Sequence, residues 1–320
     1  MDNQRAYQRL CHLLNGKNRF LIASHQKPDA DTLGASTALA HWLSKQSKEV
    51  TLFCKDLPGR QHAYLDHYFE IQNQPEVFNK EYEAIIILDS SSLEYCGISE
   101  LMAHLPPGYL TINIDHHATN TNFADFNLVD KEAGSTSEII GSFFEYNRLD
   151  IDSAMATSIM AGILSDTSYF SNAAANAANL NLTGKLIAGG ARTTEIAQSL
   201  LKNKDANTLR LWGVALSRLK INRRLNMAVT YLKAEDLRHA GADAGATEGI
   251  SNFLGGTCGE TEIIMILTET DDNHIKGSIR SVKTDISKIA QAVGGGGHKL
   301  ASGFKIQGKI LETAQGIKII

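Results

Sequence analysis

The chain has 320 residues, of which 43% are hydrophobic and 21% are charged. These are ordinary globular values that argue against disorder, and the length suffices for about two domains. With 31 basic and 35 acidic side chains, the net charge of -4 disfavours a broad electrostatic grip on long duplex nucleic acid. The net charge is compatible with binding of small anionic ligands at a local site.

The cysteines and the hydropathy of the chain indicate the cellular compartment in which the protein is expected. The four cysteines are far apart and form no CxxC pair, which fits neither a zinc knuckle nor a disulfide framework. No apolar stretch approaches the roughly 20 residues of a membrane span, and the first ten residues lack the apolar core of a signal peptide. We therefore expect free thiols in a cytoplasmic protein with no membrane partner.

Up to about residue 190, short apolar runs alternate with helical patterns. The predicted strands are 20–24, 50–54, 84–88 and 111–114, and the predicted helices include 32–44 and 135–146. This alternation predicts βαβ units and a parallel sheet covered on both faces. The sequence pattern is helical from residue 135 to about residue 219. Asn172 is a candidate helix N-cap in the Ala- and Asn-rich tract of this region.

A second α/β pattern follows the basic stretch at residues 220–224. Its predicted strands are 227–233, 262–268, 275–281 and a final one at 302–306, with helices at 248–254 and 286–293. The fold class is therefore α/β: an N-terminal parallel-sheet domain with flanking helices and a smaller C-terminal α/β domain. We expect these domains at residues 1–190 and 225–320, joined by a helical linker at 191–224, with the substrate in the cleft between them.

Three clusters of acidic and histidine residues each follow a predicted strand. The clusters are His25, Asp29 and Asp31 after FLIAS, Asp89 after AIIIL, and Asp115, His116 and His117 after TINI. The carboxyl ends of neighbouring parallel strands share one edge of a sheet, so the clusters would meet in one cleft. Groups brought this close need a cation between them. The sequence therefore predicts a dinuclear metal site.

Each cluster alone also has a simpler explanation. Asp31 or Thr32 could cap the following helix with His25 at the surface, and Asp89 could be a helix N-cap. Asp166 in GILSDTSYF would be a fourth acid in the cleft, unless it caps the next helix. A carboxylate at the sheet edge has two oxygens, so Asp89 could bridge two metals as in two-metal phosphoryl chemistry.

Taken together, the motifs resemble the DHH phosphoesterases. The residues that carry the resemblance are HxxPDxD at 25–31, the strand-end Asp89, IDHHxxN at 114–120, Asp166-Thr167, and GGGGHKLASG at 294–303. The last of these resembles the signature of the DHHA1 domain. The resemblance spans about residues 25–304, and within the superfamily the chain is most similar to the nano-RNase and pAp-phosphatase branch.

The resemblance implies a ligand set for two metal ions. One ion would be held by His25, Asp29 and Asp89, and the other by Asp31, Asp89, His116 and Asp166, with Asp89 as the bridge. It also implies that His117 faces the substrate phosphate and that Asp115 orients a ligand histidine. We assign the catalytic role to Asp89, Asp115, His116 and His117. Histidine and carboxylate ligands suit Mn²⁺, with Mg²⁺ or Co²⁺ as alternatives.

In the smaller domain, the resemblance implies a site for a terminal phosphate or a nucleotide. Its residues would be His117 from the first domain together with Arg280, Ser281, Gly295, Gly296, Gly297 and His298. Physical chemistry agrees, because successive glycines let backbone N–H groups approach an anion and an arginine can grip a phosphate with two bonds.

Four features depart from the family pattern. Ser92 stands where relatives often carry a second acid, and Tyr95 stands where a basic residue is expected. Ser168 replaces the usual Gly of DTG, and the Ala-rich tract 173–178 replaces a Thr-containing segment. These changes leave the metal ligands intact and affect the substrate contacts.

The sequence therefore predicts a metal-dependent phosphoesterase in which two ions activate a water. The expected substrate is a short single-stranded oligoribonucleotide or 3′-phosphoadenosine 5′-phosphate (pAp), and long duplex nucleic acid is excluded. The alternatives are a phosphodiesterase for c-di-AMP or linear dinucleotides, a pyrophosphatase, and a nucleotide-binding module without turnover. The GGGGHKLASG ending argues against the pyrophosphatases, and the complete ligand set argues against the binding module. The sequence is also compatible with a homodimer.

Overall fold

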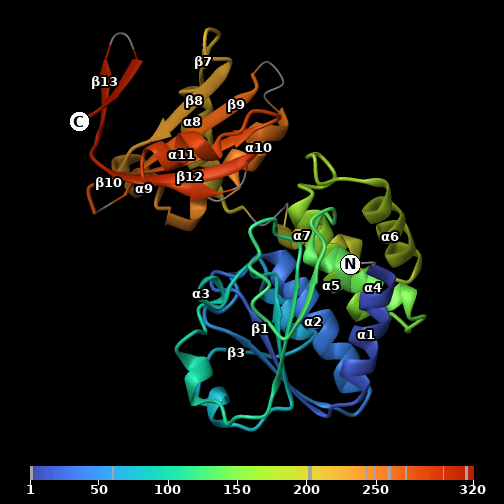
Figure 1. Ribbon diagram of the computed structural model, residues 1–320. Coiled ribbons are helices and arrows are strands. Elements are labelled where there is room, and N and C mark those ends of the chain that lie inside the picture. Colours follow the sequence, from blue (N-terminus) through green and yellow to red (C-terminus); the bar gives the residue numbers. More distant parts are fainter. Residues whose placement is uncertain are drawn as a thin grey trace. The chain divides into compact units, whose positions relative to one another are not determined.

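The computed structural model describes residues 3–59, 61–200, 204–242, 244–247, 249–257, 261–270, 272–297, 299–313 and 316–320. The chain divides into two compact units, Met1–Asn203 and Lys204–Ile320 (Figure 1). Of the predicted linker, α7 (Thr193–Leu200) belongs to the first unit and α8 (Ala206–Ser217) to the second. The predicted domain boundaries at residues 190 and 225 stay predictions.

The first unit contains a six-stranded sheet in the order β3-β2-β1-β4-β5-β6, with every pair parallel. Its strands are β1 (Arg19–Ser24), β2 (Glu49–Cys54), β3 (Ile71–Gln72), β4 (Ala84–Leu88), β5 (Leu110–Asp115) and β6 (Phe126–Val129). Ser24 pairs with Leu88 and Leu88 with Ile114, so the carboxyl ends of β1, β4 and β5 lie level. The strand order reverses between β1 and β4, which is where α/β sheets open a binding crevice.

Both faces of this sheet are covered, which confirms the prediction from the apolar strands. Ile86 and Leu88 of β4 face one buried cluster, while Ile85 and Ile87 face another. The helices of the unit are α1 (Asn3–Asn15), α2 (Ala30–Lys45), α4 (Thr136–Tyr146), α5 (Ser153–Asp166), α6 (Ala177–Ala188) and α7, with the short α3 (Leu93–Cys96) and the 3₁₀ segments Ala63–His67, Pro75–Asn79 and Leu101–His104.

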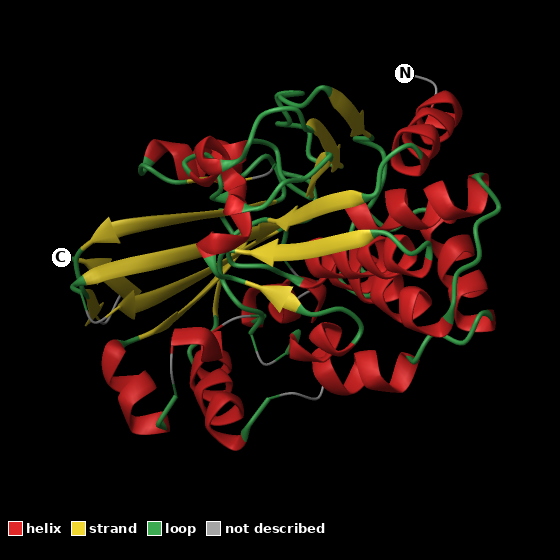
Figure 2. Cartoon of the chain, turned by 90° about the horizontal axis from the view of Figure 1, so that it is seen from below, coloured by secondary structure: helices red, strands yellow, loops and turns green. Residues whose placement is uncertain are grey.

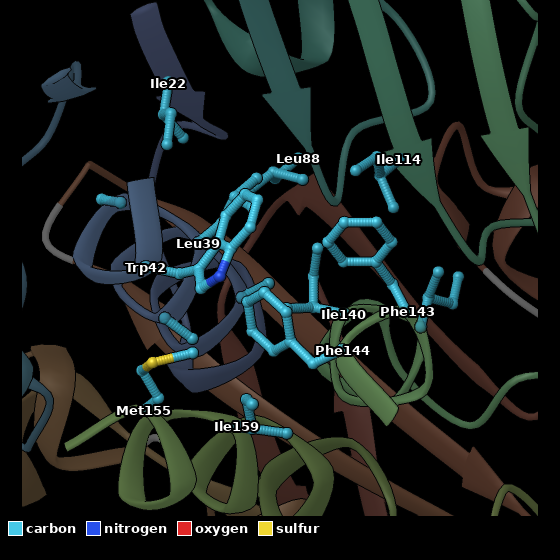
Figure 3. Packing of buried hydrophobic residues seen from close by; sticks show 14 of the residues in the cluster. Ile22, Leu39, Trp42, Leu88, Ile114, Ile140, Phe143, Phe144, Met155 and Ile159 are labelled. Carbon is cyan, nitrogen blue, oxygen red and sulfur yellow. The ribbon is translucent and has the colours of Figure 1, made fainter. Parts of the chain in front are cut away.

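Aromatic and aliphatic side chains fill the space between the sheet and helices α2, α4 and α5. Figure 3 shows Trp42 among Leu39, Phe143 and Phe144 in this core. The rings of Trp42 and Phe143 lie 6.0 Å apart at 88°, an edge-to-face contact of the kind that stabilises cores. This packing fixes the amino ends of α2 and α4 beneath the carboxyl edge of the sheet.

One predicted cap is wrong. Asn176, not Asn172, caps α6, because its side chain accepts from the Asn179 amide while Asn179 reaches back to the Asn176 amide. This reciprocal capping box satisfies two backbone donors at once. Asn172 instead donates to the backbone oxygen of Asp166 at 2.7 Å.

The second unit contains a mixed sheet in the order β11-β12-β10-β9-β8-β7, in which only the β8–β9 pair is parallel among the described strands. Its strands are β7 (Lys220–Asn222), β8 (Met227–Leu232), β9 (Ile263–Thr270), β10 (His274–Ser281), β11 (Gly296–Gly297) and β12 (Ala301–Gln307). The strand predicted as final is followed by a hairpin, β13 (Ile310–Thr313) and β14 (Gly316–Ile319).

The helices of the second unit are α8, α9 (Ala234–Ala240), α10 (Ile250–Thr257) and α11 (Ser287–Ala292), with a 3₁₀ turn at Ala244–Thr247. Leu211 of α8 and Leu254 of α10 pack on Ile264 and Ile266 of β9. Figure 2 shows the strands in yellow and the helices in red. Among the described helices, none combines the length and apolar character that a membrane crossing requires.

Candidate active site

The loop after β1 carries the first cluster. Lys27 has a φ of 54°, which turns the chain sharply between His25 and α2. Asp29 is the N-cap of α2, and its Oδ1 accepts from the amides of Asp31 and Thr32 at 3.0 and 3.1 Å. Asp29 therefore caps the helix, a role that the sequence alone offered to Asp31 or Thr32. Its Oδ1 also lies 3.8 Å from Nε2 of the buried His25.

Asp31 is fully buried in the first turn of α2. Its two oxygens accept from the amides of Thr136 and Ser137, at 2.7 and 2.8 Å. These amides belong to the first turn of α4, whose N-terminal N–H groups have no partner within the helix and favour an anion. Ser135 begins this helix by accepting from the Glu138 amide. The amino end of α4 thus fixes the Asp31 carboxylate.

Asp89 occupies the centre of the site, directly after β4. It is buried, and its φ of 55° lies in the left-handed region that a non-glycine residue rarely adopts. Its Oδ2 lies 3.5 Å from Nε2 of His25, and its Oδ1 lies 3.6 Å from Nε2 of His116. Oδ1 also accepts from the hydroxyl of Thr136 at 2.9 Å. The two oxygens of one carboxylate therefore face histidines from different loops.

The Asp115-His116-His117 run ends β5. Asp115 is fully buried and accepts from Nδ1 of His117 at 2.7 Å and from Nδ2 of Asn120 at 2.5 Å. It was expected to orient a ligand histidine, but Nδ1 of His116 faces the backbone oxygen of Ala133 at 3.3 Å instead. Of the two neighbouring histidines, Asp115 therefore orients His117, the residue expected to face the substrate, and not the predicted ligand His116.

Asp166 is the last residue of α5 and does not cap the next helix. Its Oδ2 lies 3.3 Å from Nε2 of His116, which brings the fourth acid to the cluster as predicted. The three residues Ser168, Tyr169 and Phe170 follow with φ values of 47°, 58° and 62°. Strained backbone of this kind persists where the surrounding structure determines it, and it is frequent next to functional sites.

Three groups of side chains could each hold a cation. In every group, one ligand atom from each residue lies within 4.8 Å of the others. The groups are His25, Asp29 and Asp89; Asp31, His116 and Asp166; and Asp89, His116 and His117. The structure thus brings together all six residues predicted as metal ligands, with Asp89 shared between groups.

The electrostatics of the cluster fit a divalent cation. Burial and the charges of Asp89 and Asp166 raise the pKa of Asp31 well above its usual range. Burial also raises the pKa of Asp166 to about 6. Burial disfavours a charged His116, but the bond to Asp166 and the charge of Asp89 outweigh it and raise the pKa of His116 to about 11.

His25 follows the same pattern, because the bond and charge of Asp89 overcome burial and raise the pKa of His25 to about 9. Among the residues that the structure describes, the basic groups within 4.0 Å of the Asp29, Asp89 and Asp166 carboxylates are histidines, with no lysine or arginine. The raised pKa values of these histidines show that the carboxylates favour positive charge at this site, and imidazole with carboxylate is a donor set that suits divalent metal ions.

The residues predicted in the smaller domain lie on neighbouring strands of the second sheet. Arg280 of β10 pairs with Ala301 of β12, and Gly297 of β11 pairs with Ser302 next to it. Gly297 has a φ of 135°, and a Cβ on Gly295 would lie 2.2 Å from a backbone oxygen, so these positions require glycine. His298 lies outside the described residues. Ser281 accepts from the Thr284 amide through its hydroxyl.

Arg280 also lines a pocket between α10 and the sheet. The pocket residues are Thr247, Gly249, Ile250, Ser251, Ile266, Thr268, Lys276, Ser278 and Arg280. Burial lowers the pKa of Arg280, which nevertheless stays cationic at neutral pH because its usual value is so high. Lys276 and Arg280 give the pocket a positive charge.

The roles of several residues around the site were missed by reasoning from the sequence. Thr136 and Ser137 hold Asp31 and Asp89, and Asn120 holds Asp115. The S-x-x-E spacing of Ser135 and Glu138 is a capping-box pattern that could have marked the amino end of α4. Asn120 is the last residue of the IDHHxxN motif at 114–120, which marked its position but not its bond to Asp115.

Comparison with known proteins identifies the family. Residues 19–176 match the DHH family, N-terminal domain, and residues 224–317 match the DHHA1 domain. The two matches together cover most of the chain, and the candidate metal ligands all fall within the first. This chain belongs to the DHH/DHHA1 phosphoesterase family.

Two curated relatives and one solved structure are similar over most of the chain. The "Bifunctional oligoribonuclease and PAP phosphatase NrnA" of Thermus thermophilus is 27% identical, covering 92% of this chain and 86% of the relative. A "Probable manganese-dependent inorganic pyrophosphatase" of Streptococcus agalactiae is 24% identical, covering 74% of this chain and 81% of the relative. The crystal structure of an exopolyphosphatase-related protein from Bacteroides fragilis matches with a TM-score of 0.88 and 25% identity, covering 96% of this chain and 92% of that one.

Proposed function

We propose that this protein is a dinuclear-metal phosphoesterase that hydrolyses short single-stranded oligoribonucleotides, pAp, or both. The observation that carries the proposal is the Asp89 carboxylate, whose Oδ2 faces His25 at 3.5 Å while its Oδ1 faces His116 at 3.6 Å. Such a carboxylate can bridge two ions. Similarity to the T. thermophilus enzyme supports the substrate class.

The ligand sets follow from the groups of neighbouring side chains. His25, Asp29 and Asp89 would hold one ion, and Asp31, His116 and Asp166 would hold the other, with Asp89, whose Oδ1 lies 3.6 Å from Nε2 of His116, as the shared ligand. Mn²⁺ is the proposed metal, supported by the manganese-dependent relative, and Mg²⁺ and Co²⁺ are the alternatives. When bound, two such ions supply an activated water and neutralise charge on the phosphate.

The remaining residues of the site position the proposed metal ligands and the substrate contact. The amides of Thr136 and Ser137 hold the Asp31 carboxylate, so that its oxygens keep one orientation. The Asp115 carboxylate binds Nδ1 of His117 and thereby sets the direction of the imidazole. Nε2 of His117 is the atom that we assign to the substrate phosphate. Positioning of this kind lowers the entropy cost of the reaction.

We assign recognition of a terminal phosphate to the second unit. Arg280 supplies the positive charge, and the glycine run at 295–297 supplies closely approaching backbone, with Ser281 and His298 as further contacts. A site that reads one end of a chain needs no extended basic surface, in keeping with the net charge of -4. Long duplexes would then be poor substrates.

A panel assay tests the proposed function. The purified protein is incubated with Mn²⁺ and, separately, pAp, a dinucleotide, a five-residue RNA, c-di-AMP and pyrophosphate. We expect turnover of pAp or the short RNAs and none of pyrophosphate, because the chain carries a DHHA1 domain. Preference for c-di-AMP would replace the proposed substrate, and turnover of pyrophosphate alone would overturn it.

A variant tests the bridging carboxylate. Asp89→Ala should leave at most one metal ion per chain and lower kcat by more than the roughly 10- to 100-fold typical of losing an outer-shell partner. Asp125→Ala is the matched control, since Asp125 is an exposed acid of the same unit that bonds Thr111. Two ions per chain with activity retained in Asp89→Ala would refute the bridge.

We place the protein in the cytoplasm, where thiols stay reduced, because Cys54 and Cys96 are buried and unpaired. A homodimer is proposed as an alternative to the monomer, and light scattering of the purified protein distinguishes the two.

A further inference from the structure

Tyr95 is a large aromatic side chain placed beside the candidate metal centre. It belongs to the short helix α3, in the loop that follows Asp89, and its amide is capped by the hydroxyl of Ser92 at 3.2 Å. The centre of its ring lies 5.3 Å from that of His25 and 6.3 Å from that of His117. Its side chain therefore borders both the proposed metal ligands and the proposed phosphate contact.

The fold does not use this ring as core. Cys96, the next residue of α3, is fully buried, and its Sγ bonds the backbone oxygen of Ser24. Leu93 packs against the same buried cluster. Tyr95 by contrast is 47% exposed. Its neighbours anchor the helix, so the exposed face of the ring is available for a ligand.

The chemistry of the tyrosine side chain indicates which part of a ligand it contacts. A tyrosine side chain carries no positive charge, so it cannot grip a phosphate as a lysine or an arginine would. What the ring offers instead is a flat apolar face next to the place proposed for the phosphate. Aromatic faces stack on nucleobases of any sequence.

We propose that Tyr95 is a specificity-determining residue that stacks on the nucleobase adjacent to the phosphate held at the metal centre. This inference rests on the proposed function, because it presumes a nucleotide substrate. It deepens that function by naming the part of the substrate that is read in the first unit: the base next to the scissile phosphate, recognised by its face and without sequence preference.

The test compares Tyr95→Leu with Tyr95→Phe on an intact dinucleotide and on its two abasic analogues, which lack the base on the 5′ side or on the 3′ side of the scissile phosphate. Stacking on one base contributes a factor of about 5 to about 150 in affinity. Tyr95→Leu should raise KM for the intact dinucleotide by such a factor and leave KM unchanged for the one abasic analogue that lacks the stacked base. Tyr95→Phe should stay close to the unmodified protein on all of these substrates.

A binding readout separates recognition from turnover. The dissociation constant of a phosphorothioate dinucleotide should rise in Tyr95→Leu by the same factor as KM, while the metal content of the variant stays unchanged. Tyr109→Leu is the matched control, because Tyr109 is a partly exposed tyrosine that precedes β5, at the opposite end of that strand from Asp115. Should Tyr95→Leu fold poorly, Tyr95→Trp provides the second variant, and it should bind at least as tightly.

Three results would overturn the inference. These are equal KM values for Tyr95→Leu and the unmodified protein, equal losses on the intact dinucleotide and on both abasic analogues, or a loss in Tyr95→Phe as large as in Tyr95→Leu, which would assign the contact to the hydroxyl. Failure of the proposed function is distinguishable, because the unmodified protein would then cleave none of the nucleotides in the panel.

Discussion

Replacing Gly162 with alanine should damage both the fold and the metal site. Gly162 lies in α5, where a Cβ atom would come within 2.0 Å of the Ser137 hydroxyl and 2.7 Å of Oδ1 of Asp31. Those two groups are already fixed, because the Ser137 amide donates to the same Asp31 oxygen at 2.8 Å. The added methyl group must therefore displace the Asp31 carboxylate, the first turn of α4, or α5 itself.

The magnitude follows from two opposing effects. Alanine in place of glycine stabilises a helix interior by about 0.5 to 1 kcal/mol. Overpacking a filled core costs about 1 to 3 kcal/mol. At Gly162 we expect the second effect to dominate, with a net loss of up to about 2.5 kcal/mol from these two ranges. At Gly184 in α6, where nothing lies within 4 Å of the added Cβ, only the first effect operates.

Denaturant unfolding and elemental analysis check this prediction. Gly162→Ala should unfold at a lower denaturant concentration than the unmodified protein and bind less than its full complement of Mn²⁺. The control Gly184→Ala should unfold at an equal or higher concentration and bind the same metal. If Gly162→Ala were as stable as Gly184→Ala and retained all its metal, the contact between α5 and Asp31 would not constrain the site.

Two further predictions concern backbone strain and pH. Ser168→Gly should raise the unfolding temperature, because the φ of 47° costs a serine roughly 1 kcal/mol or more that glycine avoids; an unchanged or lower temperature would contradict this. Asp152 caps α5, and although partial burial works against it, bonds from the Met155 amide and Lys45 lower the pKa of Asp152 to about 2. Asp152→Ala should therefore cost about 1 kcal/mol at neutral pH. Because folding lowers the pKa of Asp152, the stability difference between the variant and the unmodified protein should be complete above the unfolded-state pKa of about 3.9 and should vanish as the pH falls through about 2. A stability difference that stays constant between pH 7 and pH 2 would refute this prediction.

The sequence was most informative where strands are buried on both faces. AIIIL at 84–88 coincides with β4, because a run of five apolar residues rich in isoleucine is too short for a typical helix and fits a strand buried on both faces. The clusters after β1, β4 and β5 meet for the same reason, since parallel strands with level ends deliver their loops to one edge. The meeting of these three clusters could thus be predicted without knowing any helix packing, whereas the division of the ligands between two ions, with Asp166 among them, came from the family resemblance.

Features that depend on contacts between distant segments could not be predicted. Asp31 is held by amides more than 100 residues further along the chain, and no local pattern records that contact. The histidine that Asp115 contacts could not be predicted, because His116 and His117 both follow it directly and only the turn of the chain after β5 selects His117. The strand β3 has two residues, too few for any periodicity.

The position of Asp89 explains why the site can be both buried and open to two histidines. A carboxylate in regular extended backbone at the end of β4 would direct its side chain to one face of the sheet. The φ of 55° at Asp89 breaks that alternation, while its amide still donates to the backbone oxygen of Ile114 at 3.0 Å. The chain therefore stays attached to β5 as the side chain turns toward the crevice where the strand order reverses, between the loop that carries His25 and the loop that carries His116. The strain at this one residue is the structural reason that a single carboxylate reaches both groups.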